Sequence, residues 1–515
     1  MKDLIKHLSK TISNRIFVIA LGILLQLMWI ITMVWGLAEL SGLFRNLITI
    51  ASIVIVLWIM NQRINPSYKL AWSILILVLP LFGVTIYFLF GKSRVAKKSE
   101  RKYNETLTQI QGFFKEKEEV HKELEVQNMR MAHSSQYIRD YGGYPVHRNT
   151  QTKYYPVGDD MFIDMLNELK KAEHFIFLEY FIISEGRMWK TVLDVLEQKA
   201  REGVDVRLIY DDMGCVTTLP HHFYKDLQAK GIKCAAFNPL KPILNIILNN
   251  RDHRKILVID GHVGFTGGIN LADEYINEYM RFGHWKDTGI MLKGDAVWNL
   301  TVMFLQMWNM ITGIESDYAM YTPQRYHSDS YETDGYVQPF GDSPLDDEVV
   351  GENVYLNVIH SAKKYVYICT PYLIIDNEMM TALCLAAKSG VDVRIMTPGI
   401  PDKKIVFLLT QSYYEQLLEA GVKIYEYIPG FLHAKSFVCD DEVAVVGTIN
   451  LDYRSLYLHF ECATWMYQSK AVMEVKEDML ETYEVCNEIT LEFCRKQNLA
   501  VRTVQSIMRV FAPML

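Results

Sequence analysis

Two short segments of the sequence carry the same set of ionisable residues. Each has a histidine, a lysine two positions on, and an aspartate after an aliphatic run: His253, Lys255 and Asp260 in "DHRKILVIDG", and His433, Lys435 and Asp440 in "LHAKSFVCDD". Residues i and i+2 of a β-strand face the same side. Each segment therefore predicts a strand that begins with an imidazole and an ammonium group side by side and ends in a turn at the aspartate.

A glycine-containing return strand follows each segment and ends in an asparagine. The glycines of "GFTGGIN" and "VVGTIN" allow close backbone approach, and Asn270 and Asn450 supply amide donors. One His–Lys pair alone is more often surface or capping chemistry than a site. Two copies at matching places in a repeat favour a joint site of two imidazoles, two ammonium groups and two amides. Such a site suits a phosphodiester, whose oxygens need charge neutralisation during transfer.

The sequence predicts that no metal or other cofactor takes part. Lysine is a poor ligand for divalent metals, and the sequence contains no HExxH, no DxD-type cage and no cysteine cluster. The two lysines can do for the phosphate what Mg²⁺ does in other enzymes.

The elements around these segments occur twice. "ELKKAEHFIFLEYFI" parallels "VIHSAKKYVYICTPYLI", and "QKAREGVDVRLIYDD" parallels "LAAKSGVDVRIMTPG", with helix-ending glycines at Gly203 and Gly390. Strands that alternate with helices indicate an α/β fold, here two similar halves of about 180 residues. Each half is expected to be a mixed sheet flanked by helices, and the two are expected to pack about a pseudo-twofold axis, joined by polar residues 318–345.

The N-terminal region differs from the rest in both hydropathy and charge. Three segments carry no charge: Ile16–Ala38, Asn46–Gln62 and Leu70–Gly91. The first and third are long enough to cross a bilayer as helices, whereas the middle one either spans or lies in the membrane. Basic clusters before the first segment and after the third compete to set the orientation, so the number of spanning helices and the side of the N-terminus stay open.

These shifts in composition predict four regions. They are a membrane-anchoring region over 1–99, a charged linker helix over 100–135 (or a flexible tether), a first domain over 136–335 and a second over 336–515. Residues 1–102 hold 13 Lys and Arg against 3 Asp and Glu, and the remainder hold 40 against 57. An acidic soluble part argues against a nucleic-acid partner. Eight cysteines without a CxxC pair indicate reduced packing residues, which fits a cytoplasmic catalytic part.

Taken together, these motifs resemble the phospholipase D superfamily, and bacterial cardiolipin synthases most closely. The resemblance runs from about residue 47 to the C-terminus and includes "NNRDHRKILVIDG", "GFTGGINLADEYI", "HWKDTG" and "VVGTINLDYRSLYLHFE". Two features depart from the family pattern. The chain has an additional apolar segment at the N-terminus, and His459 stands where the family commonly has asparagine.

The resemblance implies a role for each site residue. One histidine attacks phosphorus to form phosphatidyl-histidine and the other acts as acid and base; the family pattern makes His253 the nucleophile, although pseudo-symmetry leaves the choice open. Lys255, Lys435, Asn270 and Asn450 would bind phosphate. Asp287 and Glu461 match carboxylates that orient the imidazoles. Asp260 and Asp440, counted with the catalytic sets, would hold loops and lysines or serve only as turn residues.

The implied protein is a multi-pass phosphatidyltransferase of the bacterial cell (inner) membrane. It would convert two phosphatidylglycerols into cardiolipin and glycerol. The same residues could instead hydrolyse phospholipid as a phospholipase D with water as acceptor. A nuclease is disfavoured by the membrane segments and the acidic charge, and a non-enzymatic scaffold by two complete motifs. The oligomeric state stays open, with an oligomer among the options.

One further segment bears on lipid access. Residues 240–250, "LKPILNIILNN", form an apolar run that leads directly to His253. Such a run is usually a buried strand or helix, and the alternative is a loop that presents Ile243, Ile246 and Ile247 to the bilayer beside Lys241.

Overall fold

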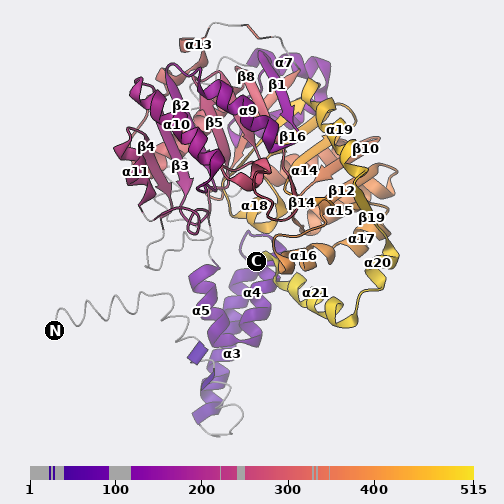
Figure 1. Ribbon diagram of the computed structural model, residues 1–515. Helices are drawn as coiled ribbons and strands as arrows, with labels where there is room; N and C mark the ends of the chain where they lie inside the picture. Colours follow the sequence, from indigo (N-terminus) through magenta and orange to yellow (C-terminus); the bar gives the residue numbers. More distant parts are fainter. Residues whose placement is uncertain are drawn as a thin grey trace, which may run out of the picture. The chain divides into compact units, whose positions relative to one another are not determined.

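The computed structural model describes residues 23–24, 27–28, 40–91, 118–220, 222–239, 250–327, 330–331, 335–346 and 348–514. They belong to two compact units. The smaller unit contains the N-terminal helices and residues 503–514, and the larger contains both sheets (Figure 1). The first predicted apolar segment falls mainly outside the described residues, and so does 240–249, so the proposed lipid-access loop stays a prediction.

Proline divides the third apolar segment into two helices. Helix α3 (Leu40–Met60) is followed by α4 (Pro66–Val78) and α5 (Pro80–Phe90). Leu79 leaves the helical conformation, at φ −127° and ψ 72°, because a residue before proline avoids it and Pro80 has no N–H to continue the ladder. The expectation of one long helix over 70–91 was therefore wrong. At 13 and 11 residues, the two helices are only about 20 and 16 Å long.

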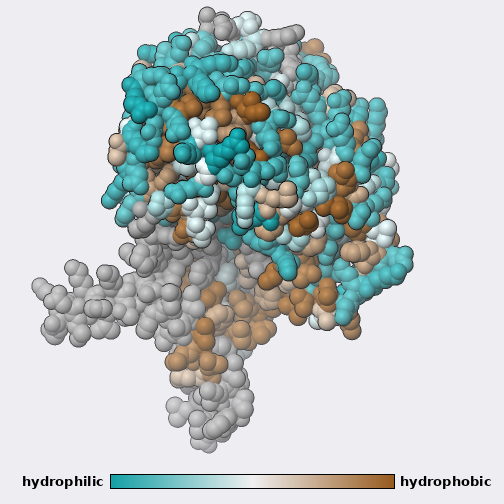
Figure 2. All heavy atoms as spheres, viewed as in Figure 1, coloured by the Kyte–Doolittle hydropathy of each residue, from teal (hydrophilic) through white to brown (hydrophobic). Residues whose placement is uncertain are grey.

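The three helices share a small core of Ile59, Trp72, Ile76 and Tyr87, against which Met514 packs. Large apolar side chains on their outer surfaces are exposed, including Ile50, Val54, Leu57, Leu70 and Val78. Figure 2 shows this hydrophobic surface on the described part of the helices. Within the described residues, no helix combines the length and the apolar composition needed to cross a membrane.

The first half of the larger unit is a seven-stranded mixed sheet in the order β1-β8-β6-β5-β2-β3-β4. Its strands are β1 (Thr150–Tyr155), β2 (Phe175–Tyr180), β3 (Asp205–Asp211), β4 (Lys233–Phe237), β5 (Lys255–Ile259), β6 (Val263–Gly267) and β8 (Gly289–Gly294). Strands β2, β3 and β4 are parallel, and the other neighbours are antiparallel. This is the mixed sheet that the sequence predicts.

Helices cover both faces of this sheet. Helices α9 (Gly158–Leu169), α10 (Arg187–Arg201) and α11 (Phe223–Ala229) share one hydrophobic core with it. Helix α12 (Val297–Thr312) packs on the other face, where Phe304 stacks on Phe177 at 4.5 Å. Because α12 also contacts the second sheet, it is buried nearly all round, which explains its apolar sequence.

The second half repeats this topology with one strand added, in the order β19-β13-β12-β10-β15-β16-β18-β9. Its strands are β9 (Tyr336–Asp342), β10 (Tyr365–Cys369), β12 (Asp392–Pro398), β13 (Lys423–Tyr427), β15 (Ser436–Cys439), β16 (Val443–Gly447), β18 (Glu461–Tyr467) and β19 (Cys486–Ile489). Strands β10, β12 and β13 are parallel, like β2, β3 and β4. The prediction of two similar halves is confirmed.

The helices of the second half include α14 (Val350–Ser361), α15 (Asn377–Lys388), α16 (Lys404–Gln411), α17 (Tyr414–Glu419), α18 (Tyr453–Tyr457), α19 (Lys470–Tyr483) and α20 (Leu491–Arg495). Gly203 after α10 and Gly390 after α15 both have positive φ, 93° and 95°, as predicted for helix-ending glycines. Two further helices precede the sheets: α7 (Glu118–Gln127), which is mostly exposed, and α8 (Met129–Tyr137). Helix α8 is bound to the second half, because the Gln338 amide donates to the Ser135 carbonyl at 3.0 Å.

Candidate active site

Both histidines lie just before their strands rather than in them. Strand β5 begins at Lys255 and β15 at Ser436, slightly later than predicted. The backbone N–H of His253 donates to the Phe460 carbonyl at 2.9 Å, and that of His433 to the Lys286 carbonyl at 2.7 Å. Each histidine backbone is thus bound to the opposite half of the molecule, and this takes it out of its own sheet.

The carboxylate that faces each imidazole also comes from the opposite half of the molecule. His253 Nδ1 lies 3.0 Å from both carboxylate oxygens of Glu461, and His433 Nδ1 lies 2.6 Å from Asp287 Oδ2. Each pair joins one half to the other. A carboxylate that accepts from Nδ1–H fixes the tautomer of the ring and leaves Nε2 free to react. This geometry brings together both predicted histidines and both predicted orienting carboxylates.

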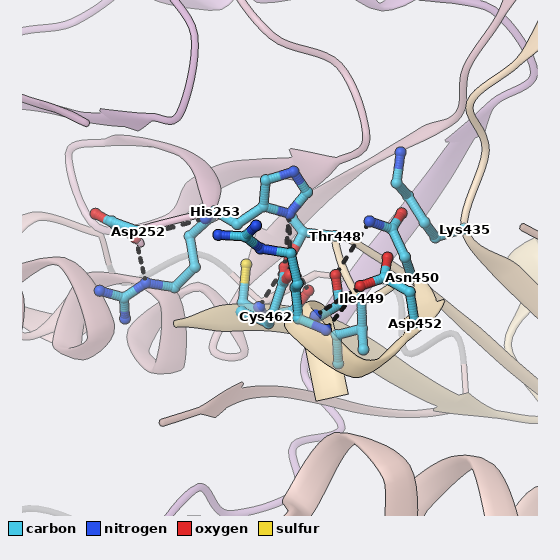
Figure 3. Close-up of polar contacts among 12 residues, drawn as sticks. Asp252, His253, Lys435, Thr448, Ile449, Asn450, Asp452 and Cys462 are labelled. Atoms are coloured by element: carbon cyan, nitrogen blue, oxygen red, sulfur yellow. Dashed lines mark hydrogen bonds and ion pairs between the residues drawn. The ribbon is translucent and has the colours of Figure 1, made fainter. Parts of the chain in front are cut away.

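The two carboxylates are held differently although their positions are equivalent. A Cβ on Gly268 would lie 1.9 Å from Asp287 Oδ1, so only glycine leaves room for that carboxylate. Thr448 stands at the matching place in the second half, and its hydroxyl donates to Glu461 Oε2. Figure 3 shows Thr448 in this position below the His253 ring.

The two lysines are fully buried beside the imidazoles. Lys255 Nζ donates to the carbonyl of His253 at 2.5 Å, and Lys435 Nζ donates to that of His433. Lys435 Nζ also lies 2.8 Å from His433 Nδ1. Figure 3 shows the His253 ring on one side of the site and Lys435 and Asn450 on the other. The charges of the two motifs also act on one another, because Lys435 lowers the pKa of His253 and Lys255 lowers that of His433.

Burial dominates the electrostatics of the site. It lowers the pKa of Lys255 to about 8 and that of Lys435 to about 7, against the opposing effect of the nearby carboxylates. It lowers the pKa of His433 to about 4 and that of His253 well below its usual range, and the lysines add to both shifts. Burial also raises the pKa of Glu461 to about 8.

The two asparagines are bound within the protein. The Asn270 carbonyl oxygen accepts from the Ile182 N–H, and its Nδ2 donates to the Tyr275 hydroxyl at 2.7 Å. Asn450 Nδ2 donates to Ser455 Oγ at 3.0 Å. These bonds hold each amide beside the site.

Asp260 and Asp440 do not join the group around the imidazoles. They lie at the other ends of β5 and β15, in left-handed turns with φ of 48° and 53°. Asp260 accepts three backbone N–H bonds at 2.8 Å, from residues 173, 174 and 175. Asp440 does the same for residues 363, 364 and 365. Their contacts are those of loop anchors, and no hydrogen bond to either motif lysine was found among the described residues.

Sequence reasoning missed several neighbours of the site. Arg254 forms buried ion pairs with Glu179 at 2.6 Å and Asp252 at 3.1 Å, and Arg251 pairs with Asp211. Aromatic rings also flank the imidazoles, among them Trp285 beside His433 and His459 beside His253. The sequence does carry a signal for these two residues, because each lies two positions before a carboxylate that faces an imidazole of the other half. Among the described residues, no group of three or more His, Cys, Asp or Glu is arranged to hold a metal ion.

The fold and the site define a protein of the phospholipase D superfamily with two catalytic halves. The family model described as "Cardiolipin synthase, PLD-like domain" matches residues 165–308 and 355–483. A second model, "Phospholipase_D-nuclease N-terminal", matches residues 47–92. The chain belongs to the family of bacterial cardiolipin synthases, as its motifs predict.

Individual relatives agree with this assignment. The chain is 35% identical to a cardiolipin synthase of Halalkalibacterium halodurans over 98% of its own length and 100% of that protein. It is 46% identical to an uncharacterised Streptococcus mutans protein over 89% of its length and 99% of that protein. The crystal structure of Haemophilus influenzae phosphatidylserine synthase is similar in fold, with a TM-score of 0.55 at 13% identity, covering 74% of this chain and 97% of that one.

Proposed function

We propose that the protein is a membrane-bound phosphatidyltransferase that makes cardiolipin and glycerol from two phosphatidylglycerols. The observation that supports this most is the pair of crossed His–carboxylate contacts beside two buried lysines. Relatives that match over nearly their whole length are cardiolipin synthases, which supports the choice of reaction. A phospholipase D that uses water as acceptor is the alternative, since it needs the same residues.

In the proposed mechanism, His253 Nε2 attacks the phosphorus of the first lipid and the P–O bond to the headgroup glycerol breaks. His433, which must first take up a proton on Nε2, gives that proton to the departing glycerol oxygen and so becomes the base for the second step. It then takes the proton from a hydroxyl of the second phosphatidylglycerol, whose oxygen attacks phosphorus and releases His253. Lys255, Lys435, Asn270 and Asn450 bind the phosphate oxygens, and Asp287 and Glu461 orient the rings.

We place the chain in the bacterial cell (inner) membrane as a multi-pass protein with its catalytic part in the cytoplasm. The exposed apolar surface of α3 to α5 and the match over residues 47–92 support membrane attachment. The proposed regions are the anchor over 1–99, the linker over 100–135, and the two catalytic domains over 136–335 and 336–515. The substrate is a phospholipid, and no nucleic acid is expected.

A product assay tests the function. Purified protein is incubated with phosphatidylglycerol in mixed micelles, and the lipids and released glycerol are identified by mass. Cardiolipin and glycerol in equal amounts support transfer. Phosphatidic acid as the main lipid product would show that water is the acceptor and would replace this proposal with hydrolysis.

A further inference from the structure

The walls beside the two imidazoles differ in chemistry although the halves are equivalent. Trp285 lies two residues before Asp287, and its ring is 5.6 Å from that of His433. His459 lies two residues before Glu461, and its ring is 6.1 Å from that of His253. The same structural position thus holds an indole on one side of the site and a third imidazole on the other.

A second pair of equivalent positions shows the same difference. Tyr275 lies five residues after Asn270, accepts a hydrogen bond from it and sits 5.6 Å from the His433 ring. Ser455 lies five residues after Asn450 and accepts the matching bond. Two aromatic side chains, Trp285 and Tyr275, thus lie beside His433, whereas the equivalent positions in the second half hold an imidazole and a hydroxyl. The His253 ring also has the Phe181 ring 4.8 Å away.

The backbone holds His459 firmly in place. The next residue, Phe460, donates its N–H to the Arg251 carbonyl at 2.8 Å and accepts from His253 N–H at 2.9 Å. His459 Nδ1 is buried, and apart from a hydrogen bond of the ring with the Leu458 backbone no partner for it was found among the described residues.

The His459 ring is neutral before substrate binds. Burial lowers its pKa well below the usual range, and the cations of Arg454, Arg251 and Lys255 lower it further, while the Leu458 carbonyl opposes the shift. A neutral imidazole offers one N–H donor and one acceptor. Such a group can bind either a phosphoryl oxygen or a hydroxyl without adding charge to a site that already holds two lysines.

We propose that His459 is a substrate-positioning residue, which hydrogen-bonds an oxygen of the glycerophosphate headgroup beside His253. This role rests on the proposed function and adds a third imidazole to the residues that act on the substrate. The oxygen belongs either to the phosphoryl group or to the headgroup hydroxyl, and both present the same hydrogen-bonding chemistry.

The test compares His459→Leu with His459→Asn in the full-length protein. Leucine removes hydrogen bonding, whereas asparagine keeps a donor and an acceptor. His459→Leu should lower kcat/KM by roughly 10- to 100-fold, the range for a lost hydrogen bond to a charged partner. His459→Asn should stay close to wild type. His262→Asn is the matched control, because His262 lies in the turn at the far end of β5 against His327.

A comparison of two donor lipids identifies which substrate oxygen His459 binds. Phosphatidyl-enzyme formation is measured in a single turnover with phosphatidylglycerol and with phosphatidylethanol, whose headgroup has no free hydroxyl. A loss in His459→Leu with both lipids assigns the contact to the phosphoryl oxygen, and a loss with phosphatidylglycerol alone assigns it to the hydroxyl.

Two results would overturn the inference. One is a His459→Leu variant with wild-type rates on both lipids, and the other is a His459→Asn variant as impaired as His459→Leu. Melting temperatures are measured alongside, and a purely structural role predicts a lower melting temperature with unchanged kcat/KM. A wild-type protein that forms neither cardiolipin nor phosphatidyl-enzyme would instead refute the proposed function.

Discussion

Burial makes both imidazoles neutral and makes the two lysines easy to deprotonate before substrate arrives. A phosphodiester brings a further negative charge to the two lysines, so its binding favours their protonated form. The neutral His253 ring can then attack through Nε2, since Nδ1 is engaged by Glu461. His433, whose Nδ1 is engaged by Asp287, must take up a proton on Nε2 before it can act as the acid. The pKa shifts therefore serve the proposed chemistry.

His253→Ala and His433→Ala should each abolish cardiolipin formation, because the two rings act as a unit. Both variants should stay folded and membrane-bound. The measurements are product mass, sedimentation with membranes and melting temperature. Near-wild-type turnover in either variant would refute the two-histidine mechanism.

The pH dependence follows from the lysines. Since the pKa of Lys435 is lowered to about 7 and that of Lys255 to about 8, both lose their protons as pH rises through this range. The value of kcat/KM, which reports the free enzyme, should therefore fall above about pH 7 to 8. Bound phosphodiester raises both lysine pKa values, so kcat should decline only at higher pH. Identical alkaline limbs for kcat and kcat/KM would contradict this account.

At the scale of elements, strands β5 and β15 separate two kinds of residue. The motif histidine lies before the first residue of each strand, the motif lysine lies at or just before it, and a loop-anchoring aspartate follows the last residue. The return strands β6 and β16 lead to Gly268 and Thr448, which shape the places of the two carboxylates.

Gly268→Ala should displace Asp287, because the new Cβ would lie 1.9 Å from Oδ1. Loss of the orienting carboxylate should cut kcat by at least about 100-fold. Gly142→Ala is the control, since the nearest atom to its Cβ would be 3.4 Å away. An active Gly268→Ala variant would show that Asp287 is not needed at its present position.

Asp440→Asn should weaken the fold and spare the chemistry. It loses the carboxylate that accepts three backbone N–H bonds, at a cost of about 2 kcal/mol in the free energy of unfolding. Turnover per folded molecule should be unchanged. The same change at Asp287 should do the reverse, with lower kcat and little change in melting temperature. A catalytic role for Asp440 would be indicated if its variant lost turnover while melting normally.

At the scale of the whole molecule, the site exists only because the two halves meet. Each histidine takes its backbone partner and its carboxylate from the other half. The positive charge for the phosphate also comes from both halves, one lysine from each.

Activity should need no divalent ion, because the two lysines neutralise the phosphate charge. A chelator in detergent solution should leave the rate close to unchanged, and added Mg²⁺ or Mn²⁺ should not raise it. A strict requirement for either ion would show that the phosphate charge is handled in another way.

Much of the fold and of the site was readable from local pattern. The repeated helix–glycine–strand segments predicted two equivalent mixed sheets, and the spacing of His253, Lys255 and their counterparts predicted the reacting groups. Proline at position 80 was also visible, yet hydropathy alone suggested one long helix over 70–91. A hydropathy average over many residues hardly changes when it includes one proline. The helix is interrupted there because proline has no backbone N–H to donate to the helical hydrogen bonds.

The sequence by itself predicted which groups react, since residue type and strand periodicity act over a few positions. Only the tertiary structure decided how they pair. The His253–Glu461 and His433–Asp287 contacts join residues 208 and 146 positions apart, and no local propensity encodes such contacts. The difference between His459 and Trp285 also became visible only in the tertiary structure. The packing of the two halves decides which catalytic imidazole each of these residues lies beside.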